Sequence, residues 1–201
     1  MSLQDTWKRN QMVVVDLETT GTLPNYHEII QIAVVPLTPD LVPCKTHKPF
    51  YIDMAPEHPD RQEAIARKKT KLNAEELATT GISQERAADL FEDWVTKLDL
   101  PAGKRLIPLA HNWAFEKSFL VPWLGLERFN SLWYIHPRDT MLLAAGLNDM
   151  AAWNAQDIPF PRLALKAMCD ISGIDIINAH NALSDALATA KLYRWMLGQF
   201  A

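Results

Sequence analysis

Two acidic residues end a strongly apolar segment near the start of the chain. Residues 12–15 read Met-Val-Val-Val, and Asp16 and Glu18 follow them. Three consecutive valines favour a buried strand, and strands of open α/β sheets bind ligands at their carboxyl ends. Carboxylates are ligands for hard cations, so Asp16 and Glu18 are predicted to bind a divalent metal ion. The alternative is an acidic strand end in water. Because strand side chains alternate, a shared ion is expected to need a break near Leu17, which residues 19–21 could supply.

Two later segments also carry residues suited to metal binding or proton transfer. Glu116 follows His111 and Asn112 in the first turns of an expected helix, with Asn112 as its N-cap. A glutamate there also stabilises the helix dipole, which is the alternative role for Glu116. His180 lies just before the final helix, five residues ahead of Asp185. A lone histidine in such a loop is more often a surface or capping residue, and the sequence leaves both roles open.

The elements that would position these residues follow from hydrophobic periodicity and capping signals. Strands are expected over residues 12–18, 28–35, 46–52, 104–110 and 132–135, the fourth short or bulged because of Pro108. Helices are expected over residues 73–81, 83–98, 112–120, 139–147, 161–171 and 181–199. Residues 149–160 are expected to form a loop with Trp153 as its anchor. Since two strands follow the first without an intervening helix, the sheet is expected to be mixed.

Composition limits the class of protein. The 201 residues contain no Gly/Ser-rich or Pro-rich linker, so one domain spanning residues 1–201 is expected. The net charge of −4 argues against a general coating protein for polyanions. Nucleic acid would have to be bound through a local basic patch or through metal ions. Residues 61–71 are the most basic segment, and a solvated helix face is favoured slightly over a nucleic-acid contact for them.

The amino-terminal segment has no apolar signal core, and no apolar run approaches the length of a transmembrane helix. Cys44 and Cys169 are too few for a disulfide framework and lack metal-ligand spacing. A cytoplasmic protein without a membrane contact is therefore expected.

Taken together, the motifs resemble the DEDDh (DnaQ-like) branch of the DEDD 3′–5′ exonucleases, within the RNase H-like superfamily. Residues 13–21 are similar to the first motif of that family, and residues 180–186 to its third. The resemblance runs from Val13 to about Leu197. It implies an α/β fold with an RNase H-like mixed β-sheet flanked by helices on both faces. The activity that it implies is removal of nucleotides from a 3′ end.

The resemblance also implies roles for individual residues. Asp16, Glu18 and Asp185 would hold one divalent cation, Mg²⁺ or Mn²⁺, and Asp16 would bridge to a second. Glu116 stands where the family normally has aspartate, and it would belong to the shell of the second ion. His180 matches the general base of the family.

Four further residues are predicted to bind the substrate. Leu17 and Thr19 flank the metal ligands where the family grips the terminal nucleotide, and Asn112 and Trp113 belong to the second motif. Trp113 could stack on a base or pack under the sheet. Tyr26 and Trp153 are weaker stacking candidates.

The chemistry explains the need for these residue types. Hydrolysis of a phosphodiester requires a strong nucleophile and stabilisation of charge on the attacking and leaving oxygens, which two cations held by carboxylates provide. Four neighbouring carboxylates without metal would raise one another's pKa values. A histidine, which titrates near neutrality, could accept the proton of the attacking water.

The predicted function is therefore 3′–5′ exonucleolytic hydrolysis of single-stranded or frayed DNA or RNA, releasing nucleoside 5′-monophosphates. The alternative is a non-catalytic nucleic-acid-binding or assembly module with the same fold, and Glu116 favours it. An endonuclease or a phosphohydrolase of small nucleotides is less favoured. A homodimer is an open expectation, and the choice between DNA and RNA is not decided by the sequence.

Overall fold

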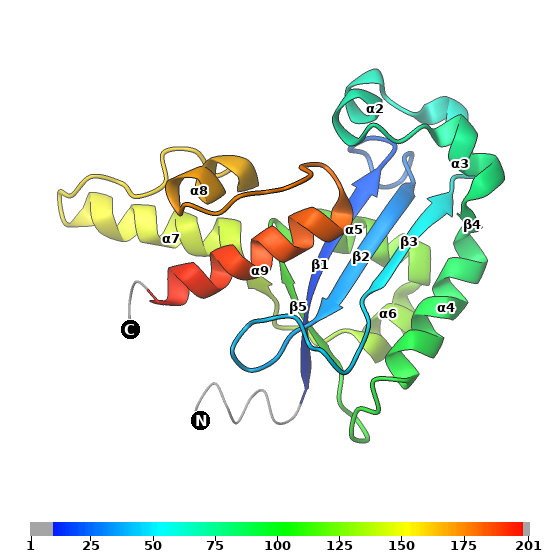
Figure 1. Ribbon diagram of the computed structural model, residues 1–201, viewed down its shortest axis with the longest axis horizontal. Coiled ribbons are helices and arrows are strands. Elements are labelled where there is room, and N and C mark those ends of the chain that lie inside the picture. Colours follow the sequence, from blue (N-terminus) through cyan, green and yellow to red (C-terminus); the bar gives the residue numbers. More distant parts are fainter. Residues whose placement is uncertain (1–9, 199–201) are drawn as a thin grey trace.

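The computed structural model describes residues 10–198, and a mixed β-sheet runs through their centre (Figure 1). The strand order is β4-β3-β2-β1-β5-β6. The strands are β1 (Gln11–Thr19), β2 (Ile29–Pro36), β3 (Phe50–Ala55), β4 (Ile82–Ser83), β5 (Leu106–Ala110) and β6 (Arg138–Asp139). Strands β1, β2 and β3 form an antiparallel meander, whereas β5 is parallel to β1. The mixed sheet that the sequence predicts is confirmed.

Helices cover both faces of this sheet. They are η1 (Pro59–Arg61), α2 (Ala64–Thr70), α3 (Ala74–Thr80), α4 (Gln84–Thr96), α5 (Trp113–Leu124), α6 (Leu126–Leu132), α7 (Thr140–Trp153), α8 (Leu165–Ile171) and α9 (Ala182–Gly198). Side chains of α4, α5 and α6 pack on one face and those of α9 on the other, while α7 and α8 pack against α9 (Figure 1). This is the RNase H-like α/β fold expected from the sequence.

Strand β1 is the centre of both cores because its side chains alternate between the two faces. Val13, Val15 and Leu17 pack with α4, α5 and α6, whereas Met12 and Val14 pack with α9. All five side chains are buried, so the apolar run is explained by helices on both sides of the strand.

Strand β5 tolerates a proline within the sheet. Pro108 is paired with Val13 of β1, and all five residues of β5 are buried. The carbonyl of Leu106 accepts from the N–H of Tyr134 on the side away from β1. The backbone of Pro108, two residues on, faces that same side, where β6 pairs only with Leu109 and Ala110. The missing N–H therefore removes no bond to β1, and β5 runs from Leu106 to Ala110 without a bulge in its pairing with β1 at Pro108.

The structure corrects three expectations for the second half of the chain. The strand expected over residues 132–135 is wrong, because residues 126–132 form α6 and the last strand is β6 at residues 138–139. Helix α7 continues to Trp153, whose side chain is 90% exposed, so Trp153 anchors no loop. Good helix formers such as Met and Ala in the last turns explain this extension. Helix α8 begins at Leu165, four residues after the predicted start. Among residues 10–198, no helix is both long and apolar enough to cross a membrane.

Candidate active site

The carboxyl end of β1 presents Asp16 and Glu18 on the face that α9 covers. The pairing of β1 with β2 is regular from Val13 through Glu18, and the register shifts only between Glu18 and Thr19. The expected break near Leu17 is therefore wrong, and it is not needed, because residues two apart on a strand share a face. Glu18 is buried and Asp16 is half-buried, which excludes an acidic strand end dissolved in water.

The start of α9 lies at this end of the sheet (Figure 1). His180 and Asp185 lie beside Glu18 there. The buried side chain of Gln31, on β2, accepts from the N–H of Ala182 at 2.9 Å and from the amide of Asn181 at 3.3 Å. His180 has a positive φ of 63°, and its N–H donates to Oδ2 of Asp185 at 3.1 Å. The α9 end is thus fixed to β2 by a polar residue that the sequence pattern did not single out.

The start of α5 places Glu116. Asn112 is the N-cap residue of the helix, as predicted, but its φ is 81° and its side chain makes no capping bond. The carboxylate of Asp139 accepts instead from the N–H groups of Asn112 and Trp113, at 3.3 and 2.7 Å. The same carboxylate accepts from two N–H groups in the first turn of α7. Asp139, at the start of the helix expected from residue 139, therefore joins two helices and holds the turn that carries the buried Glu116.

The electrostatics show that the four acids converge. Burial raises the pKa of Asp16 well above its ordinary value, and the charges of Glu18, Glu116 and Asp185 raise it further. Burial and the charge of Asp185 raise the pKa of Glu18 to about 8, against the opposing effect of Lys69. Burial also raises the pKa values of Glu116 and Asp185. Four acids from β1, α5 and α9 therefore share one environment, in which Glu18 and Glu116 are buried and Asp16 and Asp185 are half-buried.

Two buried carboxylate oxygens have no hydrogen-bond partner in the described part of the chain, and this indicates an environment that suits a cation. Oε2 of Glu116 and Oδ1 of Asp185 are buried and find no hydrogen-bond partner within residues 10–198. Ligand atoms of Glu18, His180 and Asp185 lie within 4.8 Å of one another. A cation would satisfy the unpaired oxygens and offset the repulsion between carboxylates, which a protein without metal must tolerate. The donor set, carboxylate oxygens with one imidazole, suits a divalent metal ion.

A pocket of about 160 Å³ opens beside the acids. Leu17, Glu18, Thr19 and His180 line it, together with Phe115 of α5 and with Ile65, Lys69 and other residues of α2. The structure thus brings the predicted Leu17 and Thr19 together with the acids. Sequence reasoning missed Phe115 and Lys69 as lining residues. Phe115 belongs to the apolar stripe of α5, and Lys69 lay in the basic segment noted above.

Trp113 and Asn112 do not line this pocket. The indole of Trp113 is 7% exposed, and its ring lies 5.5 Å from that of Trp133 and 6.3 Å from that of Phe129. Trp113 packs in the core, which is the second of the two roles expected for it, and its predicted contact with substrate is wrong. Asn112 is half-buried at the start of α5, and its substrate contact stays a prediction.

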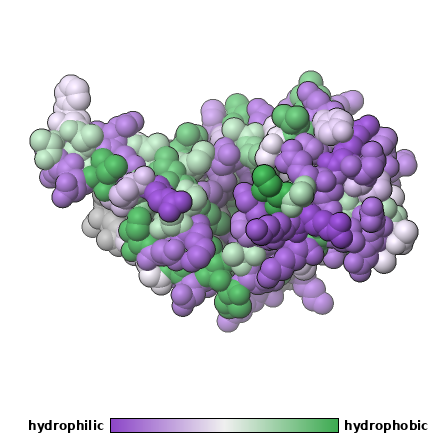
Figure 2. Space-filling view, turned by 90° about the horizontal axis from the view of Figure 1, so that it is seen from above, coloured by the Kyte–Doolittle hydropathy of each residue, from purple (hydrophilic) through white to green (hydrophobic). Residues whose placement is uncertain are grey.

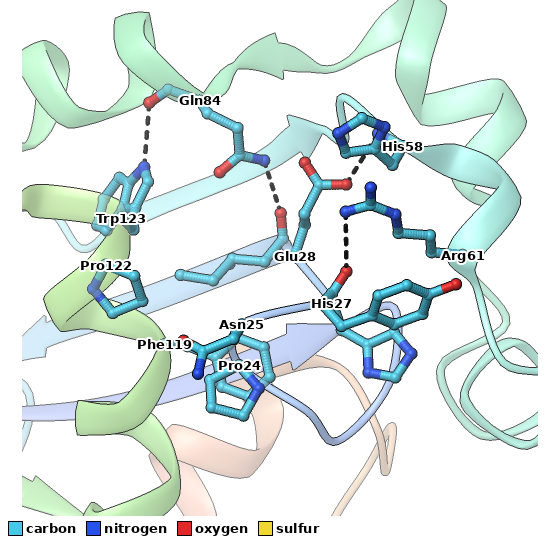
Figure 3. Close-up of a pocket in the computed structure, with 12 residues that line it drawn as sticks. Pro24, Asn25, His27, Glu28, His58, Arg61, Gln84, Phe119, Pro122 and Trp123 are labelled. Atoms are coloured by element: carbon cyan, nitrogen blue, oxygen red, sulfur yellow. Dashed lines mark hydrogen bonds between the residues drawn. The ribbon is translucent and has the colours of Figure 1, made fainter.

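A second hollow of about 200 Å³ lies against α4 and α5 (Figure 3). The carboxylate of Glu28 accepts there from the N–H of His58, and Arg61 donates to the carbonyl of Tyr26. Gln84 donates to carbonyls of β2 and β3. None of the four converging acids lines this hollow, and its polar groups fix the segment between β1 and β2 to its neighbours.

A family model described as exonuclease (RNase T) matches residues 13–193, which is most of the chain and includes every acid described above. The chain belongs to this exonuclease family. Its domain is that of a nuclease, and the resemblance to the DnaQ-like exonucleases is confirmed. Family membership and the cluster of Glu18, His180 and Asp185 together indicate that the exonuclease domain depends on a divalent metal ion.

Solved structures with the same fold are distant in sequence. E. coli exonuclease I has a TM-score of 0.71 and 19% identity, over 92% of this chain and 40% of that chain. Exonuclease I from Methylocaldum szegediense has a TM-score of 0.70 and 20% identity, over 94% and 41%. A 3′-exonuclease has a TM-score of 0.68 and 18% identity, over 95% and 64%. The exonuclease domain thus spans about two fifths of the exonuclease I chains. No curated protein sequence matches it.

Proposed function

We propose that the chain is a metal-dependent 3′–5′ exonuclease acting on single-stranded or frayed nucleic acid. The observation that carries the proposal is the convergence of Asp16, Glu18, Glu116 and Asp185 beside His180. Membership of the exonuclease family supports it. The fold relatives include E. coli exonuclease I in complex with a dT13 oligonucleotide and a 3′-exonuclease that recognises a histone mRNA stem-loop. DNA and RNA are therefore both candidate substrates.

In this proposal the four acids hold two divalent cations, Mg²⁺ or Mn²⁺. When bound, such ions lower the pKa of a water molecule and neutralise charge on the scissile phosphate. The elements that carry these carboxylates are held in place, because β1 is paired in the sheet, Gln31 accepts from the start of α9 and Asp139 accepts from the start of α5. Preorganisation of this kind is what a catalytic site requires.

His180 is proposed as the general base. Its imidazole is exposed, lies beside Glu18 and Asp185, and lines the pocket. An imidazole there can accept the proton of the attacking water and pass it to solvent. Attack on phosphorus breaks the bond to the 3′ oxygen of the preceding nucleotide, so the products are a nucleoside 5′-monophosphate and a strand with a free 3′-hydroxyl. Leu17, Thr19 and Phe115 would contact the terminal nucleoside.

The direct test is hydrolysis of a 3′-labelled oligonucleotide with Mg²⁺ or Mn²⁺. The first labelled product should be a mononucleotide, whereas an endonuclease would release longer labelled fragments. Asp185→Asn should lower the rate at least about 10³-fold, because several kcal/mol of charge stabilisation is lost. Asp149→Asn, an exposed change on α7, should leave the rate unaltered. Retained activity in Asp185→Asn would refute the assignment.

The second candidate is a nucleic-acid-binding module without catalysis. Glu116 favours this candidate. The resemblance leads one to expect an aspartate at this position, and the side chain of glutamate is one methylene longer than that of aspartate. A protein of this kind would retard the labelled strand in a gel and never shorten it. A cytoplasmic location and a homodimer stay predictions.

A further inference from the structure

A wide basic groove continues from the smaller pocket, which Glu18 and His180 line. The groove has a volume of about 700 Å³ and lies between α2 and the segment before α9. Its lining residues are Ile65, Lys68, Lys69, Lys71, Ile177, Asn178, Ala179 and His180. Ile65, Lys69 and His180 also line the smaller pocket, so the two spaces meet there.

The lysines of this groove are available to an external anion. Lys68, Lys69 and Lys71 are exposed, and none of them lies within ion-pair distance of an acidic side chain of residues 10–198. The whole chain carries a net charge of −4, so three lysines on one wall are a local concentration of positive charge. Viewed from above, the half of the molecule that carries α2 and α3 is mostly hydrophilic, with apolar residues among the polar ones (Figure 2).

Two isoleucines also line the groove. Ile65 of α2 is 68% exposed, and Ile177, before α9, is 94% exposed. Exposed isoleucines beside lysines form a surface that offers apolar contact next to positive charge. A nucleic-acid strand presents the complementary pair, since its bases are flat and apolar on their faces and its phosphates are anionic.

We infer that this lysine groove binds the phosphates of the strand on the 5′ side of the scissile bond, with Ile65 and Ile177 against its bases. The inference rests on the proposed function, which places the terminal nucleotide in the smaller pocket beside Leu17 and Thr19. A strand whose end lies in that pocket continues in the 5′ direction, and the groove meets the pocket at Ile65, Lys69 and His180. A free mononucleotide would need only the pocket, so the groove selects for polymers.

The test compares two variants that remove the same charge. Lys68→Gln/Lys71→Asn removes two groove lysines, with asparagine chosen because Lys71 has a positive φ of 61°. Arg67→Gln/Lys97→Gln is the matched control. Arg67 is an exposed residue of α2 outside the groove lining, and Lys97 is exposed at the far end of α4. Lys69 is left in place, because it also lines the smaller pocket beside Glu18.

Two substrates separate the groove from the catalytic site. The p-nitrophenyl ester of thymidine 5′-monophosphate has no 5′ strand, and both variants should hydrolyse it at the wild-type kcat/KM. On thymidine oligonucleotides of increasing length, KM of the wild type should fall as the strand fills the groove. The groove variant should lose most of this dependence, with KM for a long strand about tenfold higher at low salt.

Binding without catalysis gives an independent readout. With EDTA present, fluorescence anisotropy of a labelled dT12 strand should show a salt dependence whose slope falls by about 1.4 in the groove variant, or about 0.7 for each lost phosphate contact. The control variant should keep the wild-type slope.

Equal slopes and equal length dependence in the two variants would overturn the groove assignment, even with an active enzyme. The opposite outcome is also informative. If binding depends on the groove lysines but neither substrate is hydrolysed, the proposed exonuclease activity is overturned and the assignment of the groove as a strand-binding site is kept.

Discussion

Replacing Glu18 with glutamine should stabilise the metal-free protein while abolishing its activity. Glu18 is buried beside Asp185, and its pKa is raised from 4.5 to about 8 by burial first and by that neighbouring charge second. The folded protein therefore binds more protons than the unfolded chain between these two pH values. Stability is lost as the pH rises through this window, since the unfolded chain ionises freely and the folded site does not.

The magnitude follows from the two pKa values. The raised pKa of Glu18 lowers the free energy of unfolding by about 1 kcal/mol at pH 5 and about 4 kcal/mol at pH 8, at 1.36 kcal/mol for each pKa unit, because the unfolded chain ionises there and the folded site resists ionisation. Glutamine is nearly isosteric with the protonated acid and never ionises. Glu18→Gln should therefore raise the free energy of unfolding by about 4 kcal/mol at pH 8, and by no more than about 1 kcal/mol at pH 5.

Urea denaturation in EDTA at pH 5 and pH 8 measures this difference. Glu57→Gln is the matched control, because Glu57 is exposed and its replacement should change stability by less than about 0.5 kcal/mol at either pH. Adding Mg²⁺ at pH 8 should stabilise the wild type more than Glu18→Gln, since only the wild type keeps the complete set of carboxylates. If Glu18→Gln unfolds with the same pH dependence as the wild type, the reasoning about the buried acids is refuted.

Three other changes test the parts of the site separately. His180→Ala should slow hydrolysis by about 10²–10⁴-fold while Mn²⁺ still raises the melting temperature; an unchanged rate would remove its role as base. Asp139→Ala should cost roughly 2–4 kcal/mol in urea denaturation and also lower activity, because four backbone N–H groups lose their acceptor. Gly21→Ala should cost roughly 1–3 kcal/mol, because its Cβ would lie 2.4 Å from Cε1 of His27. Gly146→Ala, with open space around it, should be neutral or stabilising, and equal losses in the two alanine variants would contradict the packing argument.

The basic segment at residues 61–71 shows where a sequence pattern stops being informative. The pattern favoured a solvated helix face, and the lysines of this segment are indeed exposed, Lys68 and Lys69 on α2 and Lys71 at its C-cap. Only the fold places Lys69 near enough to Glu18 to influence its pKa and sets the lysines opposite residues 177–180. The sequence shows which residues of a helix are charged, but it does not show which residues lie opposite them in the fold.

The sequence alone determined the elements that local chemistry controls. The valines before Asp16 required a strand buried on both faces. The helices expected from residues 73 and 83 begin there as α3 and α4, capped by the side chains of Asn73 and Ser83. These features depend on periodicity and on hydrogen bonds within a few residues. Family motifs also identified the acids, because their residue types and order are written in the chain.

Only the tertiary structure decided how these acids meet. Residues 18, 116 and 185 come from a strand and two helices far apart in sequence, and their effect on Asp16 requires that they share one buried space. The residues that hold this space, Gln31 and Asp139, carry no catalytic signature and act through long-range hydrogen bonds. Trp113 shows the converse, since its place beside a motif suggested a contact with substrate and packing placed it in the core. Burial and long-range contacts are properties of the folded chain, so no local pattern could have fixed them.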